Sequence, residues 1–122
     1  MNTVDVGRLK AIAEFEFPDI LEEAIIPFVN ELRIILKDGS FVDVWFSLKL
    51  ANRYSYHWER RPIDGTIFRH DNAPHKNWQS IITFPKDFHD GSEDFVSESR
   101  ISDFPDQALR DFLSFVREKM TA

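Results

Sequence analysis

The chain has 122 residues, enough for one domain with a modest core, and its 43% hydrophobic and 30% charged residues are typical of a globular rather than a disordered protein. It contains no cysteine, which excludes a disulfide framework and thiolate metal sites. The net charge of -6 at pH 7 argues against non-specific binding of nucleic acid, because such binding depends on neutralising phosphates with Lys and Arg.

The N-terminus and the apolar runs indicate where the protein acts. Nothing at the N-terminus has the basic and then apolar layout of a signal peptide, and no apolar run approaches the roughly 18 residues of a membrane helix. We therefore expect a cytoplasmic protein without a membrane partner. Residues 1–122 should form a single domain that folds alone or as a small homo-oligomer.

The first predicted element is a helix. Apolar residues recur at helical spacing from Gly7 to about Glu16, and Pro18 marks the end of this helix. Residues 19–26 fit either a further helical turn or a strand, and Pro27 interrupts both. The sequence leaves these two alternatives open.

Two hairpins are predicted next. The stretch "ELRIILKDGSFVDVWF" has two runs rich in β-branched and aromatic residues around Asp38 and Gly39, which predicts strands at about 31–37 and 41–47. The segments "RYSYHWERR" and "TIFRHDN" flank "PIDG" in the same way and predict a second hairpin.

The length of the second loop decides which side chains share a face. An even number of loop residues pairs an odd position on one strand with an even position on the other, and paired residues point to the same face. One face then holds His57, Glu59, Arg61, Phe68, His70 and Asn72. The other face then holds Tyr54, Tyr56, Trp58, Arg60, Ile67, Arg69 and Asp71. The aromatic-rich face is the better core candidate, which leaves the face of His57 to solvent or a cleft.

Short elements are predicted between this hairpin and the C-terminal region. Residues 73–80 are expected to be loop, and "SIITF" (80–84) is expected to be a strand that stops at Pro85. Residues 87–94 indicate an exposed turn, and a further short strand is expected at about 95–99.

A C-terminal helix completes the predicted fold. Asp103 is expected to cap it and Pro105 to occupy its first turn. Its apolar stripe consists of Leu109, Phe112, Leu113, Val116 and Met120. We therefore predict an α+β single domain, with an antiparallel sheet of four to five strands and an N-terminal and a C-terminal helix packed on one face.

The charges and histidines locate a candidate site. Residues 49–76 form a locally basic segment in an acidic chain, with six basic and three acidic groups. All four histidines fall between positions 57 and 89: His57, His70, His75 and His89. Any chemical site is expected in this part of the chain.

The same region carries a resemblance to a known family. The stretches "YSYHW" (54–58) and "R-x-D-N-A-P-H" (69–75), followed by "F-P" (84–85), His89, Val96 and a serine at 97 or 99, resemble the TumE family. The resemblance implies the toxin half of a type II toxin–antitoxin pair, with a cognate protein antitoxin of the helix-turn-helix type. It implicates Tyr56, His57, Trp58, Arg69, Asp71, Asn72, His75 and His89.

Given this resemblance, one hypothesis is a metal-independent endoribonuclease that needs no cofactor. A neutral histidine would take the proton of a ribose 2′-hydroxyl, a second group would protonate the leaving oxygen, and an arginine would stabilise the phosphorane. The residues assigned to catalysis are His57, His75 and Arg69. The residues assigned to substrate binding are Arg61, Tyr56, Asp71, Asn72 and His89.

Three alternatives remain open. A hydrolytic metal site could use His70 or His75 with Asp71 and His89, although neighbours on a strand point to opposite faces. The DNAPH segment is also typical of a structural clamp, because Asp and Asn before Ala-Pro favour a turn, and Arg69 two residues before Asp71 can pair with it. The third alternative is a non-enzymatic module that acts by binding a protein partner.

Overall fold

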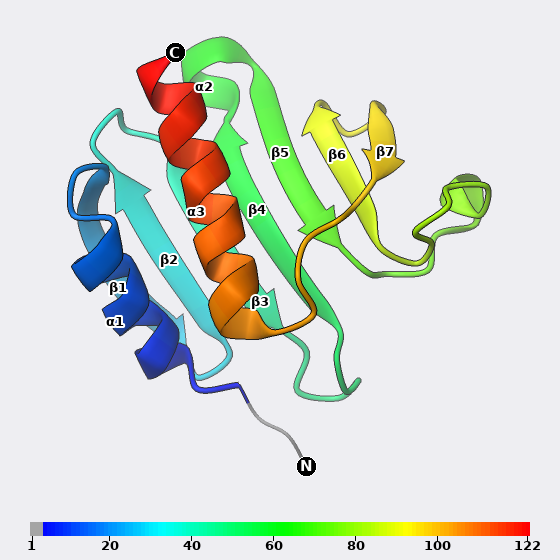
Figure 1. Cartoon of the computed structure of the whole chain (residues 1–122), viewed down its shortest axis with the longest axis horizontal. Helices are drawn as coiled ribbons and strands as arrows, with labels where there is room; N and C mark the ends of the chain where they lie inside the picture. The colour runs from blue at the N-terminus through cyan, green and yellow to red at the C-terminus, as the bar shows by residue number, and fades with distance from the viewer. Residues whose placement is uncertain (1–3) are drawn as a thin grey trace.

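One antiparallel sheet carries two long helices on a single face (Figure 1). The computed structural model describes residues 4–122. The elements are α1 (Val6–Glu16), β1 (Leu21–Phe28), β2 (Glu31–Leu36), β3 (Phe41–Phe46), β4 (Tyr54–Arg60), α2 (Arg61–Asp64), β5 (Thr66–Asp71), the 3-10 helix η1 (Lys76–Trp78), β6 (Asp87–Gly91), β7 (Val96–Glu98) and α3 (Pro105–Thr121). No helix in this part of the chain has the length and apolar character needed to cross a membrane.

The sheet is larger than the sequence predicted. It has seven strands in the order β1 to β7, each antiparallel to the next, whereas four to five were expected. The α+β class, the two hairpins and the terminal helices on one face are confirmed. The ambiguous residues 19–26 contribute most of β1, which accommodates Pro27 because it is an edge strand and its register shifts between Ile25 and Phe28.

The prediction was wrong between residues 80 and 94. The segment 80–84 forms turns instead of a strand, held by local bonds such as Phe84 N–H to Ile81 O at 2.9 Å. The expected exposed turn at 87–94 instead begins with β6 (Asp87–Gly91), and only residues 92–94 form a turn. Its polar residues Asp87 and His89 are buried because they contact each other, so polarity there did not indicate exposure.

The core lies between the sheet and the helices. Even-numbered residues of β2, β3 and β4 point toward α1 and α3, among them Trp58 and Tyr56, which are at most 2% exposed. The aromatic residues of β4 were therefore correctly predicted to lie in the core, whereas Arg69 and Asp71, predicted to share their face, lie on the other side of the sheet. Most of the predicted stripe of α3 is also buried: Leu109, Phe112, Leu113 and Val116.

The expected capping of α3 is only partly present. Pro105 occupies the first turn, as predicted, but the N-cap is Phe104 and no side chain caps the helix. Asp103 instead accepts a hydrogen bond from Lys86 Nζ at 3.1 Å. Lys86 Nζ also donates to the carbonyl of Ile101, so the carboxylate of Asp103 is bound to this lysine and not to an amide of the helix.

The second hairpin places different side chains of β4 and β5 on one face than the sequence predicted. Arg60 pairs with Thr66, so five residues, an odd number, form the connection between β4 and β5. Four of them form α2, and Gly65 closes the turn in a left-handed conformation with φ 78°. Residues of equal parity therefore pair, and His57 lies opposite Arg69, not beside His70. We call the side of the sheet away from α1 and α3, which holds both, the open face.

His70 lies on the core side as a result of this register. Its ring stacks on Phe88, with ring centroids 4.3 Å apart, and meets the edge of Phe112. Its Nδ1 is 2.7 Å from the hydroxyl of Ser99, which is itself buried. Burial in this aromatic cluster lowers the pKa of His70 to about 4.

This burial predicts a loss of stability in mild acid. In the unfolded chain His70 takes up a proton below its ordinary pKa of 6.5, whereas the folded protein resists protonation down to about pH 4. The free energy of unfolding should therefore fall by about 2–3 kcal/mol between pH 7 and pH 4.5 through this group alone. Urea unfolding of wild type and His70→Phe at both pH values measures the difference.

The variant His70→Phe keeps the aromatic packing and removes the titrating group, so it should lose less stability than wild type in acid. The variant His75→Gln serves as a control, because it removes an exposed histidine. Equal losses for wild type and His70→Phe would contradict the prediction.

Candidate functional site

One residue from each of five strands lines up across the open face. The strand registers place these residues side by side in the order Arg33, Asp43, His57, Arg69 and His89. We call this set the polar row. Because side chains alternate between the faces of a strand, one register shift anywhere in β2 to β6 would break it.

His57 lies at the centre of the polar row between a carboxylate and a guanidinium. Its Nε2 is 3.1 Å from Glu59 Oε1, and its Nδ1 is 3.4 Å from Arg69 Nη1. An arginine can only donate, so Nδ1 of His57 accepts, and the ring proton is assigned to Nε2, which donates to Glu59. The proton-accepting nitrogen of His57 therefore faces a fixed positive charge.

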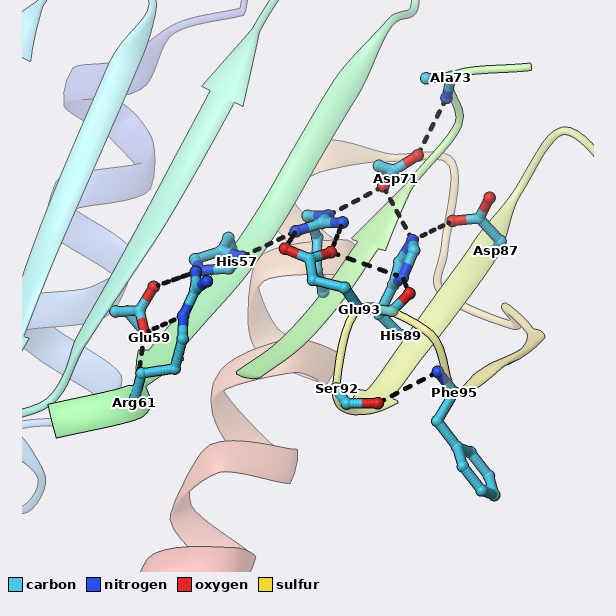
Figure 2. A network of polar contacts seen from close by, with 11 residues as sticks. His57, Glu59, Arg61, Asp71, Ala73, Asp87, His89, Ser92, Glu93 and Phe95 are labelled. Atoms are coloured by element: carbon cyan, nitrogen blue, oxygen red, sulfur yellow. Dashed lines mark hydrogen bonds and ion pairs between the residues drawn. The ribbon is translucent and has the colours of Figure 1, made fainter. Parts of the chain in front are cut away.

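Glu59 holds His57 in this orientation. Its carboxylate also accepts hydrogen bonds from Arg61, at 2.7 Å from Nη2 and 2.9 Å from Nε, and Figure 2 shows the three side chains in contact. The hydrogen bonds from Arg61 outweigh partial burial and lower the pKa of Glu59 to about 2. Glu59 is thus an ionised acceptor at any pH near neutrality.

Arg69 is held by two carboxylates. Its Nε donates to Asp71 Oδ2 at 3.0 Å, and its Nη1 and Nη2 form a bidentate pair with Glu93. Glu93 belongs to the turn between β6 and β7, and its side chain is 48% exposed. A bidentate carboxylate occupies the same donor positions of a guanidinium that a phosphate uses.

His89 occupies the far end of the polar row, next to three acidic residues (Figure 2). Its Nδ1 donates to the carbonyl oxygen of Glu93 at 2.8 Å, and its Nε2 lies 3.2 Å from Asp87 Oδ1 and 3.6 Å from Asp71 Oδ2. Burial favours the neutral ring, but the two carboxylates and the carbonyl outweigh it and raise the pKa of His89 to about 9.

The structure joins five of the eight residues assigned from the sequence into one connected network. These five are His57, Arg61, Arg69, Asp71 and His89. Tyr56 is placed elsewhere, because it is 2% exposed in the core. His75 lies exposed on the loop after β5, where its Nδ1 accepts from Asn77 N, and no hydrogen bond or ion pair among the described residues joins it to His57. Its ring lies near Trp78, which in turn lies near His89.

Sequence reasoning did not single out three members of the network. Glu59 had a usable signal, because alternation along β4 places it on the same face as His57. Asp87 would have had the same kind of signal, because it precedes His89 by two residues, if residues 87–91 had been recognised as a strand. Glu93 had no such signal, because a turn residue reaches its partner only through the three-dimensional fold.

The comparison with protein families supports the sequence resemblance. A model of the family described as Toxin TumE matches residues 8–120, a range that includes the whole network. The comparisons with curated proteins and with solved structures find no match.

Asn72, the remaining assigned residue, connects two segments of the backbone beside the network. Its Oδ1 accepts from the amide of Tyr54 at 2.9 Å, and its Nδ2 donates to the carbonyl of Asn52 at 2.6 Å. The preceding Asp71 accepts from the amide of Ala73 at 3.1 Å through its Oδ1. These bonds tie the end of β5 to the start of β4 and fix the register of the two strands.

The substitution Asn72→Ala should therefore destabilise the fold. It leaves the amide of Tyr54 and the carbonyl of Asn52 without their side-chain partner, which costs about 1–3 kcal/mol of unfolding free energy. Urea unfolding measures the loss. The control is Asn77→Ala, the same change at an exposed position of η1. Equal stability of the two variants would show that Asn72 does not hold the strands.

Proposed function

The chain belongs to the TumE toxin family, and we propose that it acts as the toxin of a type II toxin–antitoxin pair by cleaving RNA on the open face of its sheet. The proposed reaction is metal-independent and uses His57 and Arg69. The observation that carries it is the position of His57 Nδ1, an acceptor 3.4 Å from the guanidinium of Arg69.

The proposed chemistry follows from these contacts. His57 Nδ1 takes the proton of a ribose 2′-hydroxyl, and the resulting oxygen attacks the adjacent phosphorus. Arg69 stabilises the negative charge that develops on the phosphate oxygens, and the carboxylate of Glu59 stabilises the imidazolium through Nε2. The bond from phosphorus to the 5′-oxygen then breaks, which leaves a 2′,3′-cyclic phosphate, and the 5′-oxygen takes a proton from water. The assignment of His75 to the acid–base chemistry stays a prediction.

RNA must displace Glu93 to reach Arg69. In the structure the Glu93 carboxylate fills the bidentate position on the guanidinium, and its hydrogen bonds to Arg69 lower the pKa of Glu93, which keeps it charged. Because Glu93 lies on a turn and its side chain is half exposed, it can leave while the backbone of the strands stays in place. We propose that a phosphate of RNA takes its position.

The charge of the chain limits which RNA can bind. With a net charge of -6 the protein repels a polyanion at long range, so binding must come from specific contacts at the open face. Arg61, next to Glu59, provides a second exposed guanidinium for a neighbouring phosphate. This favours a short recognition site over binding along a whole strand.

The partner and the location are also proposals. A type II toxin is neutralised by a bound protein, and we propose a cognate antitoxin of the helix-turn-helix type, acting in the cytoplasm where the RNA is. Co-expression with the product of an adjacent gene of that type should restore growth to cells that make this protein. Growth that remains arrested in the presence of the bound partner would contradict this pairing.

His57→Ala tests the proposed catalytic base. Loss of the proton acceptor should lower the rate of RNA cleavage by about 100-fold to 10,000-fold, with growth arrest lost in parallel. Cleavage of a labelled RNA and colony counts after induction measure the two effects. The control is Ser55→Ala, on the same strand and the same face but outside the network. A folded His57→Ala protein that cleaves RNA and arrests growth as wild type does would overturn the proposal.

Glu93→Gln tests the competition for Arg69. Since a half-exposed ion pair is worth up to about 1 kcal/mol, removing the charge of Glu93 should tighten binding of an uncleavable 2′-O-methyl RNA about two- to fivefold. Fluorescence anisotropy at fixed ionic strength measures the dissociation constant. Glu98→Gln on β7 makes the same change in net charge away from Arg69 and should bind as wild type does. Equally tighter RNA binding in both variants would mean that only the net charge matters, which would contradict a specific competition between Glu93 and RNA for Arg69.

A further inference from the structure

Three potential metal ligands converge at the end of β5 and the start of β6. Asp71 and Asp87 lie directly opposite each other on the two strands, and His89 follows Asp87 by two residues on the same face. One ligand atom from each of the three side chains lies within 4.8 Å of the others. Ligands bound to one ion at about 2.0–2.2 Å lie roughly 3–3.5 Å apart, and His89 Nε2 is already 3.2 Å from Asp87 Oδ1 and 3.6 Å from Asp71 Oδ2.

Asp87 gives an independent indication of a ligand. Its side chain is 3% exposed, and its Oδ1 accepts no hydrogen bond from the part of the chain that the structure describes. His89 Nε2 lies within ion-pair distance of this oxygen but makes no hydrogen bond to it. A metal ion at this place would displace the proton on Nε2 and bind both atoms. A buried carboxylate oxygen without a hydrogen bond is costly, and a coordinated cation would satisfy it.

Neighbouring groups hold the ligands in the orientation that a metal requires. His89 Nδ1 donates to the carbonyl of Glu93 at 2.8 Å, which fixes the ring and turns Nε2 toward the two carboxylates. Asp71 is held through both oxygens, by the amide of Ala73 at 3.1 Å and by Arg69 Nε at 3.0 Å. Metal-binding histidines and carboxylates usually have such outer contacts, which cost affinity when they are removed.

The donor set indicates the class of ion. One imidazole and two carboxylates suit divalent first-row ions such as Mn²⁺ and Zn²⁺, whereas Mg²⁺ and Ca²⁺ prefer oxygen ligands alone. Three protein ligands also leave coordination positions for water.

We propose that Asp71, Asp87 and His89 bind a divalent first-row transition-metal ion. The site differs from the metal alternative considered for the sequence, because His70 points into the core, His75 lies on the exposed loop, and Asp87 supplies the third ligand. This inference goes beyond the proposed function, since cleavage by His57 uses no metal. It is therefore tested without RNA.

Calorimetric titration of the tag-free chain with Zn²⁺ and with Mn²⁺ tests the site. Wild type should bind one ion per chain, and Asp87→Asn should weaken binding by about tenfold or more, because it removes a ligand charge. Asp90→Asn makes the same change at an exposed position on the same strand and should bind as wild type does. A wild-type chain that binds neither ion at millimolar concentration, or equal binding by Asp87→Asn, would overturn the proposal.

A second measurement locates the ion without any substitution, which matters if Asp87→Asn does not fold. Mn²⁺ broadens amide resonances close to its binding site, so substoichiometric Mn²⁺ should first broaden the amides of residues 71, 87 and 89 in wild type. Broadening centred on the exposed loop around His75 would show that the ion binds elsewhere and would also overturn the proposal.

Discussion

The register between β4 and β5 decides which side chains meet on each face of the sheet. It is fixed at one end by the five-residue connection, where Asp64 binds both Arg60, at 3.0 Å, and the amide of Thr66, at 3.1 Å. At the other end Asn72 joins the end of β5 to the amide that opens β4. A slip of one residue would turn every side chain of a strand to the opposite face, so these few polar contacts keep core and site apart.

The open face shows how an acidic chain can hold partly buried charges. Five carboxylates in or beside the polar row each contact a cation or a histidine, namely those of Asp43, Glu59, Asp71, Asp87 and Glu93. Arg33 and Asp43, for example, form a bidentate pair at 2.8 Å. Losing one member of such a network leaves its partner charged and unpaired, which is usually more costly than the pair was favourable. The members around His89 are buried, whereas Glu93 and Arg61 are about half exposed, so we expect a ligand to displace the contacts of Glu93 and Arg61 more easily.

Local patterns predicted much of the fold, and long-range contacts account for the failures. The helices, the hairpin at Gly39 and the core position of Trp58 follow from periodicity and turn residues, which act within a few positions. The predicted register of β4 with β5 was wrong because the connection has an odd number of residues. One residue more or less in a loop changes whether odd positions pair with odd or with even positions. The strand β6 was missed because its polar residues Asp87 and His89 are buried as an ion pair, and composition alone does not reveal such a pairing. The family resemblance located His57, Arg69 and Asp71. It did not indicate Glu93, because a turn residue reaches Arg69 only through the three-dimensional fold.

The order of the strands also affects how the chain assembles. Every strand pairs with its neighbour in sequence, so the sheet can grow hairpin by hairpin as the polypeptide leaves the ribosome. The helix α3, which covers the aromatic side of that sheet, follows all seven strands, and Arg110 and Arg117 join it to Glu16 and Asp19 near the other end of the chain. The apolar face of the nascent sheet therefore stays exposed to solvent until α3 has been synthesised. A chain that is truncated before α3 would expose this apolar face and would be expected to bind chaperones or to be degraded by proteases.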